Sequence, residues 1–213
     1  MAKRRKVGNI LALALLALLA PGQPMHPYQM ASMLRRTGKE QDMKIKWGSL
    51  YTVIQNLEKH GYIEVLSSHR EGRRPERTLY GITQAGRAEL HDWLRELVAE
   101  PEPEFPRFEA ALSVIGVLPP DEVVELLEAR RRTLDTQIAT ERAALEGFQQ
   151  MVPRVFLVEA EFALAMREAE AAWVRSLLRE LAEGTLTGAA EWRSYHETGR
   201  YPPEWLQMLE ETS

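Results

Sequence analysis

Residues 47–65 read WGSLYTVIQNLEKHGYIEV, residues 67–77 read SSHREGRRPER, and residues 78–86 read TLYGITQAG. This stretch predicts a short amphipathic helix, a strand, a basic turn, a second strand and a helix capped near Thr83. A helix followed at once by a charged β-hairpin is typical of a winged helix-turn-helix. We therefore expect a mainly α fold with a small β-hairpin wing.

The helix that follows Gly48 has two unlike faces. Its apolar residues recur at i, i+3, i+4 and i+7, and they are Leu50, Val53, Ile54 and Leu57. The opposite face carries short hydrogen-bonding side chains instead of the Glu–Lys pairs of a solvated face, although an ordinary surface helix is the alternative. Such side chains can reach base edges and phosphates. From this helix and its lead-in, the predicted DNA contacts are Lys46, Ser49, Tyr51, Thr52, Gln55, Asn56 and Lys59.

The turn after this helix is strongly basic. Residues 69–77 hold four arginines around Gly72, between two β-prone runs. Arginines at such a tip can hold backbone phosphates or enter a minor groove. A solvated charged loop is the alternative, but the position directly after the helix favours DNA contact. The predicted contacts of the wing are Arg70, Arg73, Arg74 and Arg77.

Charge is divided unevenly along the chain. Residues 1–96 hold 16 Lys+Arg and 9 Asp+Glu, a net charge of +7, and residues 97–213 hold 11 and 22, a net charge of −11. No lysine follows Lys59. The basic half is therefore expected to bind nucleic acid, and the acidic half is expected to face solvent, protein or a ligand.

The N-terminal segment resembles a secretory signal peptide in sequence. The basic residues 3–6 precede ILALALLALLA at residues 10–20. If the run were a signal peptide, Pro21 would lie just after its cleavage point, where proline is unfavourable. The apolar run is also shorter than the roughly 20 residues that a membrane-spanning helix needs. We expect instead a fully buried first helix in a cytoplasmic protein without a membrane partner. We also expect the basic arm to be free to touch phosphate.

Two more helices complete the N-terminal module. Pro27 suits the first turn of a helix that stops at Gly38. After the hairpin, Thr83 is a plausible N-cap of a helix whose apolar stripe consists of Leu90, Trp93, Leu94 and Leu97. The predicted order is helix, helix, recognition helix, wing and helix.

Four spaced motifs of this module resemble the PadR family of bacterial transcription regulators. They are PMHPYQM at residues 24–30, GSLY at 48–51, LEKHGYIE at 57–64 and YGITQAG at 80–86. Pro27 stands where glycine is common in the family, and Thr52 where proline is common. The resemblance implies a dimeric winged-helix repressor, often relieved by a small effector. It implies DNA contacts from Ser49, Tyr51 and the arginines of the wing.

The C-terminal half predicts long helices after a Pro/Glu hinge at residues 99–108. A short helix ends at residues 119–120, one long helix runs from Asp121 to about residue 150, and another runs to about Glu183. Their heptad-like spacing favours pairing with a second copy, although an intramolecular bundle is the alternative. This helical C-terminal domain also resembles the longer PadR subgroup. The predicted dimer interface is Val124, Leu127, Leu134, Ile138, Leu145, Phe148, Phe162 and Trp173, with polar interruptions at Arg131 and Glu141.

The predicted domains are a winged helix-turn-helix at 1–98, the hinge at 99–108, a helical dimerisation domain at 109–183 and a tail at 184–213. The tail is rich in aromatic residues. It could dock on a partner subunit, cap a ligand cavity or fold back on its own helices. A dimer would present two recognition helices to a palindromic operator. Candidate residues of an effector pocket are Trp93, Phe105 and Phe108, for which plain core or interface packing is the alternative.

An enzyme is not expected. The five histidines are scattered, no cysteine is present, and no HExxH, Walker or GxGxxG motif occurs. We therefore predict no cofactor, no metal and no catalytic residue. The other open alternative is a winged helix that binds protein without specific DNA binding.

Overall fold

A computed structural model describes residues 5–39, 47–69, 77–201 and 203 of this chain. The chain separates into two units, Met1–Glu104 and Phe105–Ser213. The boundary between the units falls inside the Pro/Glu stretch, where residues 100–106 form neither helix nor strand. Each unit has a hydrophobic core of its own.

The apolar run near the N-terminus forms α1 (Ile10–Leu19), which begins at the N-cap Asn9. Asn9 Oδ1 accepts a hydrogen bond from the Leu11 amide at 2.9 Å. The buried residues of α1 are Leu11, Ala12, Leu13, Ala14, Leu15, Leu16 and Leu19. Because the helix is covered on nearly all sides, it needs no polar face, and the prediction of a buried first helix is confirmed. No helix in the described part of the chain is long and apolar enough to cross a membrane.

Helix α2 (Pro27–Arg36) has the predicted start and stop. His26 Nδ1 accepts from the Tyr28 amide at 3.1 Å, and Gln29 Oε1 accepts from the His26 amide at 2.8 Å. This reciprocal pair satisfies amides that a helix N-terminus leaves without partners. At the other end, Gly38 adopts a φ of +74°, as a helix stop requires.

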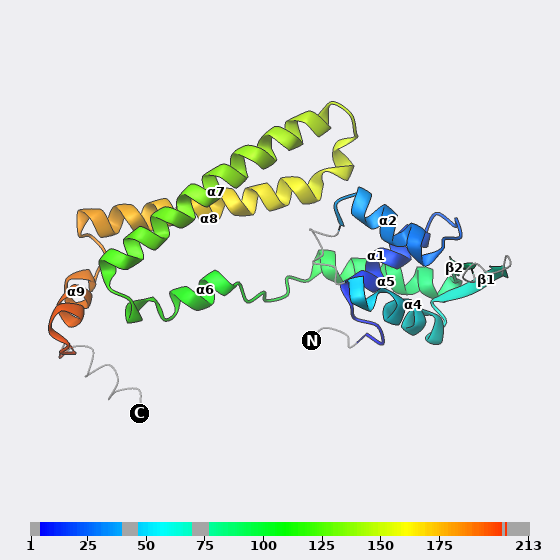
Figure 1. Ribbon diagram of the computed structural model, residues 1–213, viewed down its shortest axis with the longest axis horizontal. Coiled ribbons are helices and arrows are strands. Elements are labelled where there is room, and N and C mark those ends of the chain that lie inside the picture. The colour runs from blue at the N-terminus through cyan, green and yellow to red at the C-terminus, as the bar shows by residue number, and fades with distance from the viewer. Residues whose placement is uncertain (1–4, 40–46, 70–76, 202, 204–213) are drawn as a thin grey trace. The chain divides into compact units, whose positions relative to one another are not determined.

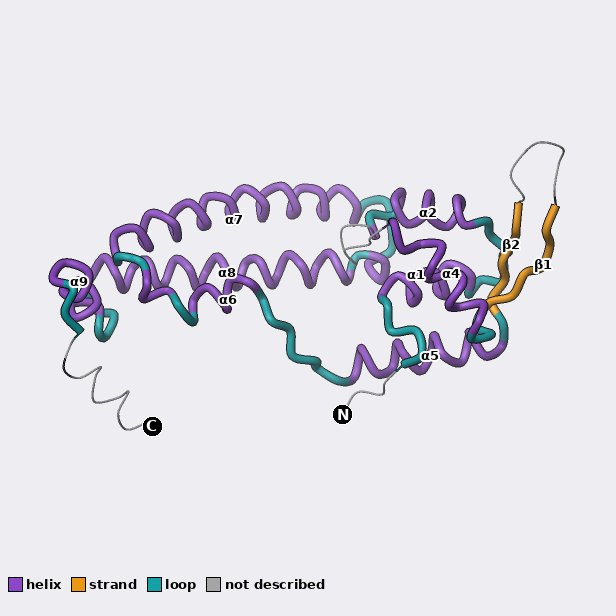
Figure 2. The backbone as a smooth tube through the Cα atoms, turned by 60° about the horizontal axis from the view of Figure 1, so that its bottom comes forward, coloured by secondary structure: helices purple, strands orange, loops and turns teal. Residues whose placement is uncertain are grey.

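The short 3-10 turn η1 (Trp47–Ser49) leads into α4 (Leu50–Lys59), and Gly61, with a φ of +71°, turns the chain into β1 (Ile63–His69). Strand β2 (Arg77–Ile82) pairs antiparallel with β1, from Ile63 opposite Ile82 to His69 opposite Arg77. Figure 2 shows the two strands side by side. A register shift lies between Val65 and Ser67.

Helix α5 (Gln84–Ala99) is tied to the turn after α4. Thr83 Oγ1 accepts from the Gly86 amide at 3.0 Å and donates to the Gly61 carbonyl at 2.6 Å. A Cβ at Gly86 would lie 2.0 Å from the carbonyl oxygen of Tyr62, so only glycine fits there. The Thr-Gln-Ala-Gly sequence therefore joins the end of α4, the wing and α5.

The C-terminal unit is built on α7 (Pro120–Gln149) and α8 (Val158–Glu183), which pack as an antiparallel hairpin around the turn η3 (Arg154–Phe156). Helix α6 (Arg107–Leu112) and the 3-10 turn η2 (Ile115–Val117) precede α7. The seam of the hairpin is apolar and buries Val123, Leu127, Leu134, Ile138, Leu164, Ala171, Val174 and Leu178.

Part of the predicted tail folds back on its own unit. Helix α9 (Ala189–Thr198) places Trp192 in the core, where Nε1 donates to the carbonyls of Gly116 at 3.1 Å and Leu118 at 2.9 Å. Arg193 pairs with Asp121 at 2.7 Å. Of the three alternatives for the tail, these contacts support folding back for residues 189–198.

Candidate nucleic-acid interface

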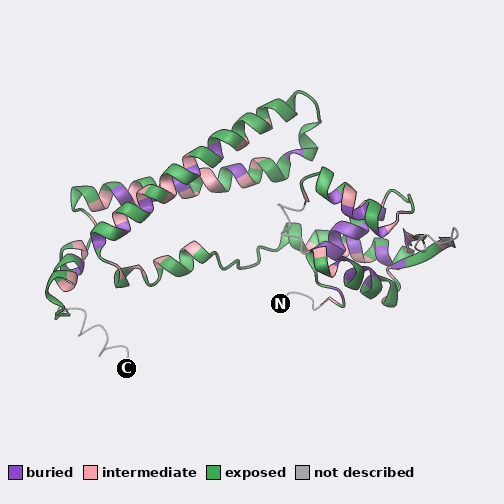
Figure 3. Cartoon of the chain, in the orientation of Figure 1, coloured by how far each residue is buried: buried purple, intermediate pink, exposed green. Residues whose placement is uncertain are grey.

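Helix α4 separates its buried and exposed residues as the sequence predicts. Leu50, Val53, Ile54 and Leu57 are buried, with Leu57 fully inaccessible. Figure 3 shows the alternation of buried and exposed positions along the helix. The exposed residues of the outer face are Tyr51, Thr52, Gln55, Asn56, Glu58 and Lys59. This face offers hydroxyl and amide groups together with one cation, which suits contact with bases and phosphates.

The wing lies directly beyond α4, because only Gly61 and Tyr62 separate the C-cap His60 from β1. The base of the wing is joined to the rest of the unit through Met25 and Tyr80, whose backbones exchange two hydrogen bonds of 3.0 Å. Burial raises the pKa of the Tyr80 phenol, and the charge of Glu58 raises it further. Tyr80 packs partly buried against the core of the N-terminal unit.

Several predicted contacts lie outside the described residues. They are Lys46, Arg70, Arg73 and Arg74, so the tip of the wing stays a prediction. The backbone of Arg77 pairs with His69 at the end of the hairpin. Ser49 is half-buried at the N-cap position of α4.

The expectation of a free basic arm is wrong for Arg5. The Arg5 side chain is 5% exposed and pairs with Glu89 at 2.7 Å, with Asp92 at 3.3 Å and with Glu96. Its guanidinium also lies 5.3 Å from the centre of the Trp93 ring. Burial alone would lower the pKa of Arg5, but the hydrogen bonds to Glu89 and Glu96 outweigh it and raise the pKa. Arg5 therefore fastens the N-terminal arm to α5 and cannot reach phosphate from there.

Known proteins share this arrangement. Residues 15–92 match the model of the transcriptional regulator PadR-like family. This likeness to the family covers 78 of the 213 residues, all within the N-terminal unit. No curated protein matches it in sequence.

The fold of this chain is similar to that of solved regulators. Bacillus subtilis PadR in complex with operator DNA is 21% identical with a TM-score of 0.65, and the match covers 81% of this chain and 99% of that one. The same protein in complex with p-coumaric acid has a TM-score of 0.66 at the same identity and coverage. The Vibrio cholerae virulence activator AphA is 19% identical, has a TM-score of 0.59 and is covered to 98%, over 81% of this chain. At these identities the likeness shows the fold.

The predicted dimer residues fall into two groups. Leu127, Leu134 and Ile138 are 3%, 6% and 8% exposed in the single chain, because they face α8. They have little surface left for a partner. Val124 and Leu145 are partly buried, whereas the more exposed members are Phe148 at 51%, Phe162 at 67% and Trp173 at 47%.

The three candidate pocket residues have different surroundings. Trp93 is 4% exposed within the core of the N-terminal unit. Phe105 is 91% exposed. Phe108 packs edge-on against Trp173 at 6.0 Å, and Arg130 lies 3.6 Å from the centre of its ring. Core packing, the alternative stated above, accounts for Trp93.

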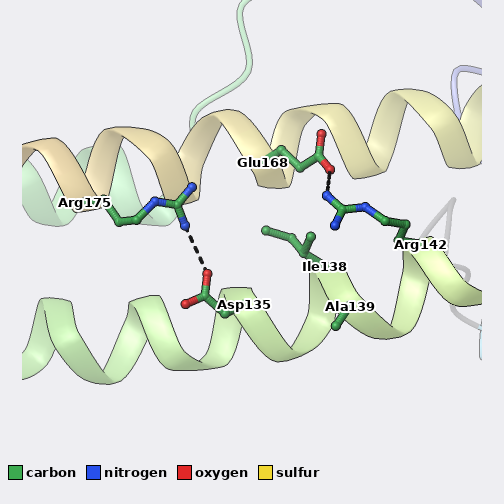
Figure 4. A pocket seen from close by; sticks show the side chains of 6 residues that line it. All are labelled: Asp135, Ile138, Ala139, Arg142, Glu168 and Arg175. Atoms are coloured by element: carbon green, nitrogen blue, oxygen red, sulfur yellow. Dashed lines mark hydrogen bonds and ion pairs between the residues drawn. The ribbon is translucent and has the colours of Figure 1, made fainter.

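A groove of about 250 Å³ lies between α7 and α8 (Figure 4). It is lined by Asp135, Ile138, Ala139, Arg142, Glu168 and Arg175. Arg175 pairs with Asp135 at 3.1 Å and Arg142 pairs with Glu168. Because every charge that lines the groove already has a partner of opposite sign, the groove is best explained as a row of ion pairs beside the apolar seam. Among the residues that the structure describes, no group of three or more His, Asp or Glu could hold a metal ion.

Sequence reasoning missed two residues that border the interface. The guanidinium of Arg35, on α2, lies 4.4 Å from the centre of the Trp47 ring. Trp47 begins η1 and packs against the core. The only signal in the sequence was a tryptophan two residues before Ser49, which no helical periodicity could connect to Arg35.

Proposed function

We propose that this chain is a homodimeric repressor that binds a palindromic operator and is released by a small-molecule effector. The observation that carries this proposal is the outer face of α4, where exposed Gln, Asn, Thr and Tyr side chains stand beside the wing. The fold it shares with a PadR solved on operator DNA supports the same role. DNA contacts are assigned to Lys46, Ser49, Tyr51, Thr52, Gln55, Asn56, Lys59, Arg70, Arg73, Arg74 and Arg77.

The turn of the α7–α8 hairpin supports the dimer. Phe148, Met151, Val155, Phe156, Phe162 and Met166 are all at least 51% exposed over residues 148–166. Exposed apolar side chains this close together mark an interaction surface more often than free solvent contact. We assign this surface, which includes the predicted residues Phe148 and Phe162, to contact with a second copy. A twofold pair of α4 helices would then read two half-sites about one DNA turn apart.

Release by an effector is proposed from the related PadR that was solved with p-coumaric acid. Phe105 and Phe108 have surface to offer such a molecule, whereas Trp93 has almost none. A cytoplasmic location follows from a DNA-binding role. No cofactor is part of the proposal.

The decisive experiment is a titration of the purified chain against the intergenic DNA upstream of its own gene, with random competitor present. We expect saturation at two protomers per site. For six to ten phosphate contacts, affinity should fall roughly 10³- to 10⁵-fold between 50 and 200 mM salt. Binding with no salt dependence, or no preference over random duplex, would favour the alternative in which the winged helix binds protein.

Two substitutions on α4 test the assignment of roles. Gln55→Ala should relax sequence preference, because a glutamine amide can read an adenine edge. Lys59→Ala should weaken binding to every duplex about equally and reduce the salt slope by about one. Equal losses on specific and random DNA for both variants would refute base reading by Gln55.

A further inference from the structure

The first turn of the recognition helix is held differently from the other helices of its unit. Side-chain caps begin α1 at Asn9, α2 at His26 and α5 at Thr83. At α4, Ser49 occupies the N-cap position without a side-chain cap hydrogen bond. Capping side chains of this kind stabilise a helix by roughly 1 kcal/mol. The contacts that residues just before Leu50 make with the rest of the unit therefore bear on the direction of this first turn.

Trp47 supplies one of these contacts. It lies two residues before Ser49, begins η1 and packs partly buried against the core that also holds Leu50 and Ile54. The Arg35 guanidinium lies over its indole ring, 4.4 Å from the ring centre. A guanidinium stacks well on tryptophan, the strongest of the aromatic partners of a cation. The ring is thus held by the core on one side and by α2 on the other.

Arg36 provides an internal comparison. It is the next residue of the same last turn of α2 and is exposed, as Arg35 is. The ring contact on Trp47 belongs to Arg35. Two neighbouring arginines therefore share charge, helix and exposure, and they differ in the contact with Trp47.

We propose that Arg35 and Trp47 are a positioning pair for DNA reading. The stack holds the first turn of α4 against α2 and so sets where Ser49 and Tyr51 meet the operator. The pair acts through α4 and determines sequence preference, while the exposed face of α4 makes the contacts. This inference rests on the proposed DNA-binding function.

The test compares five variants of the full chain, among them the conservative Arg35→Lys, on two duplexes. One duplex is enriched from a random-sequence library by the wild-type chain, and the other is a shuffled version of it. Arg35→Met removes the cation but keeps an apolar stem, and Trp47→Leu removes the ring without changing charge. The double variant and Arg36→Met, as the charge-matched control, complete the set. The measured quantity is the ratio of dissociation constants on the two duplexes.

We expect Arg35→Met and Trp47→Leu each to lower this ratio about two- to five-fold, the range of an exposed cation–π contact. The double variant should lose no more than the larger single loss, because both changes remove one contact. Trp47→Leu should leave the salt slope unchanged. Arg36→Met should leave the ratio unchanged, and Arg35→Lys should restore part of it.

Two outcomes would contradict the positioning role of Arg35 and Trp47 and leave the proposed DNA-binding function standing. A phosphate contact by Arg35 would weaken both duplexes equally and reduce the salt slope, leaving the ratio intact. Partial unfolding would also scale both affinities by the folded fraction and leave the ratio intact. If the wild-type chain enriched no duplex from the library, the proposed DNA-binding function itself would fail. That failure differs from a failure of the positioning role, in which the wild-type chain has a measurable ratio and the variants keep it.

Discussion

In the N-terminal unit the helices α1, α2, α4 and α5 close around one core, whereas in the C-terminal unit α7 and α8 share a single seam. Leu16, Leu19 and Leu57 are at most 1% exposed in the first unit. In the second unit Phe156 and Phe162 remain 67% exposed. A helix surrounded by others can be apolar all round, but a helix of a two-helix hairpin has one inner side.

The C-terminal unit adds ion pairs along its seam. Arg167 pairs with Glu141 at 2.7 Å between the two helices, and Arg131 pairs with Glu128 at 2.8 Å and Asp135 at 2.9 Å within α7. Half-exposed pairs of this kind contribute little stability. We therefore expect the N-terminal unit to be stable by itself, and we expect the C-terminal hairpin to gain stability if the proposed dimer forms.

The largest expected effect is in the core of the first unit. Leu16→Ala should lower the free energy of unfolding by about 3 kcal/mol, because it leaves a cavity among side chains that cannot collapse. Leu126→Ala, at a position 52% exposed on α7, should change it by less than about 0.5 kcal/mol. Urea unfolding followed by tryptophan fluorescence measures both. Equal losses would contradict the contrast between the two units.

The next effect concerns the arm that Arg5 fastens to α5. Arg5→Met should cost about 2 kcal/mol, less than a fully buried pair, because the carboxylate of Asp92 is half-exposed. Arg95→Met is the matched control, because it removes an exposed arginine of α5 itself, and it should leave the free energy of unfolding nearly unchanged. Adding Glu89→Gln to Arg5→Met should recover part of the loss in urea unfolding. No recovery would mean that carboxylate repulsion is not the cause.

A smaller effect is expected on self-association. Phe156→Ser, in the turn η3, and Phe162→Ser, in the first turns of α8, should each weaken the dimer about tenfold, because each removes an exposed aromatic side chain from the proposed interface. Sedimentation equilibrium measures the dissociation constant. Phe105→Ser, at a residue that lies outside the hairpin and is even more exposed, should leave the constant unchanged. A wild-type chain that is monomeric at every concentration would contradict the dimer itself.

The smallest effect is a local shift in pKa. Hydrogen bonds from Arg154 at 2.9 and 3.1 Å lower the pKa of Glu161. A lowered folded-state pKa stabilises the fold above the ordinary pKa of glutamate, and this contribution is lost as pH falls through the folded value. Arg154→Gln should therefore raise the pKa of Glu161 toward its ordinary value in an NMR titration. Arg142→Gln, which removes a pair with Glu168 instead, should leave Glu161 unchanged.

Much of the N-terminal unit could be predicted because its signals are local. The stripe from Leu50 to Leu57, the stop at Gly61 and the cap at Thr83 each depend on a few neighbouring residues. The stripe predicted on α5 is confirmed only in part. Leu90 and Trp93 are buried, but Leu94 and Leu97 remain 42% and 38% exposed in the single chain. Periodicity shows that a face is apolar, and it does not show what covers the face.

The same limit applies to the long helices. The spacing of Leu127, Leu134 and Ile138 predicted a helical partner, and the tertiary structure supplied α8 of the same chain. Glu141, which interrupts the heptad, is explained by Arg167 across the seam. A heptad pattern looks the same whether the helix pairs within its own chain or with another chain. The sequence alone therefore could not decide which of the two partners covers this face.

By itself the sequence determined helix α4, the order of elements around the wing and the ends of the long helices, because periodicity and the signals that stop a helix act within one or two turns. Only the tertiary structure decided that Arg5 meets Glu89, 84 residues away, that Arg35 stacks on Trp47, and that Trp192 donates to Gly116 across 76 residues. These contacts depend on how whole helices pack against one another. Packing brings together side chains whose positions in the sequence carry no mutual signal.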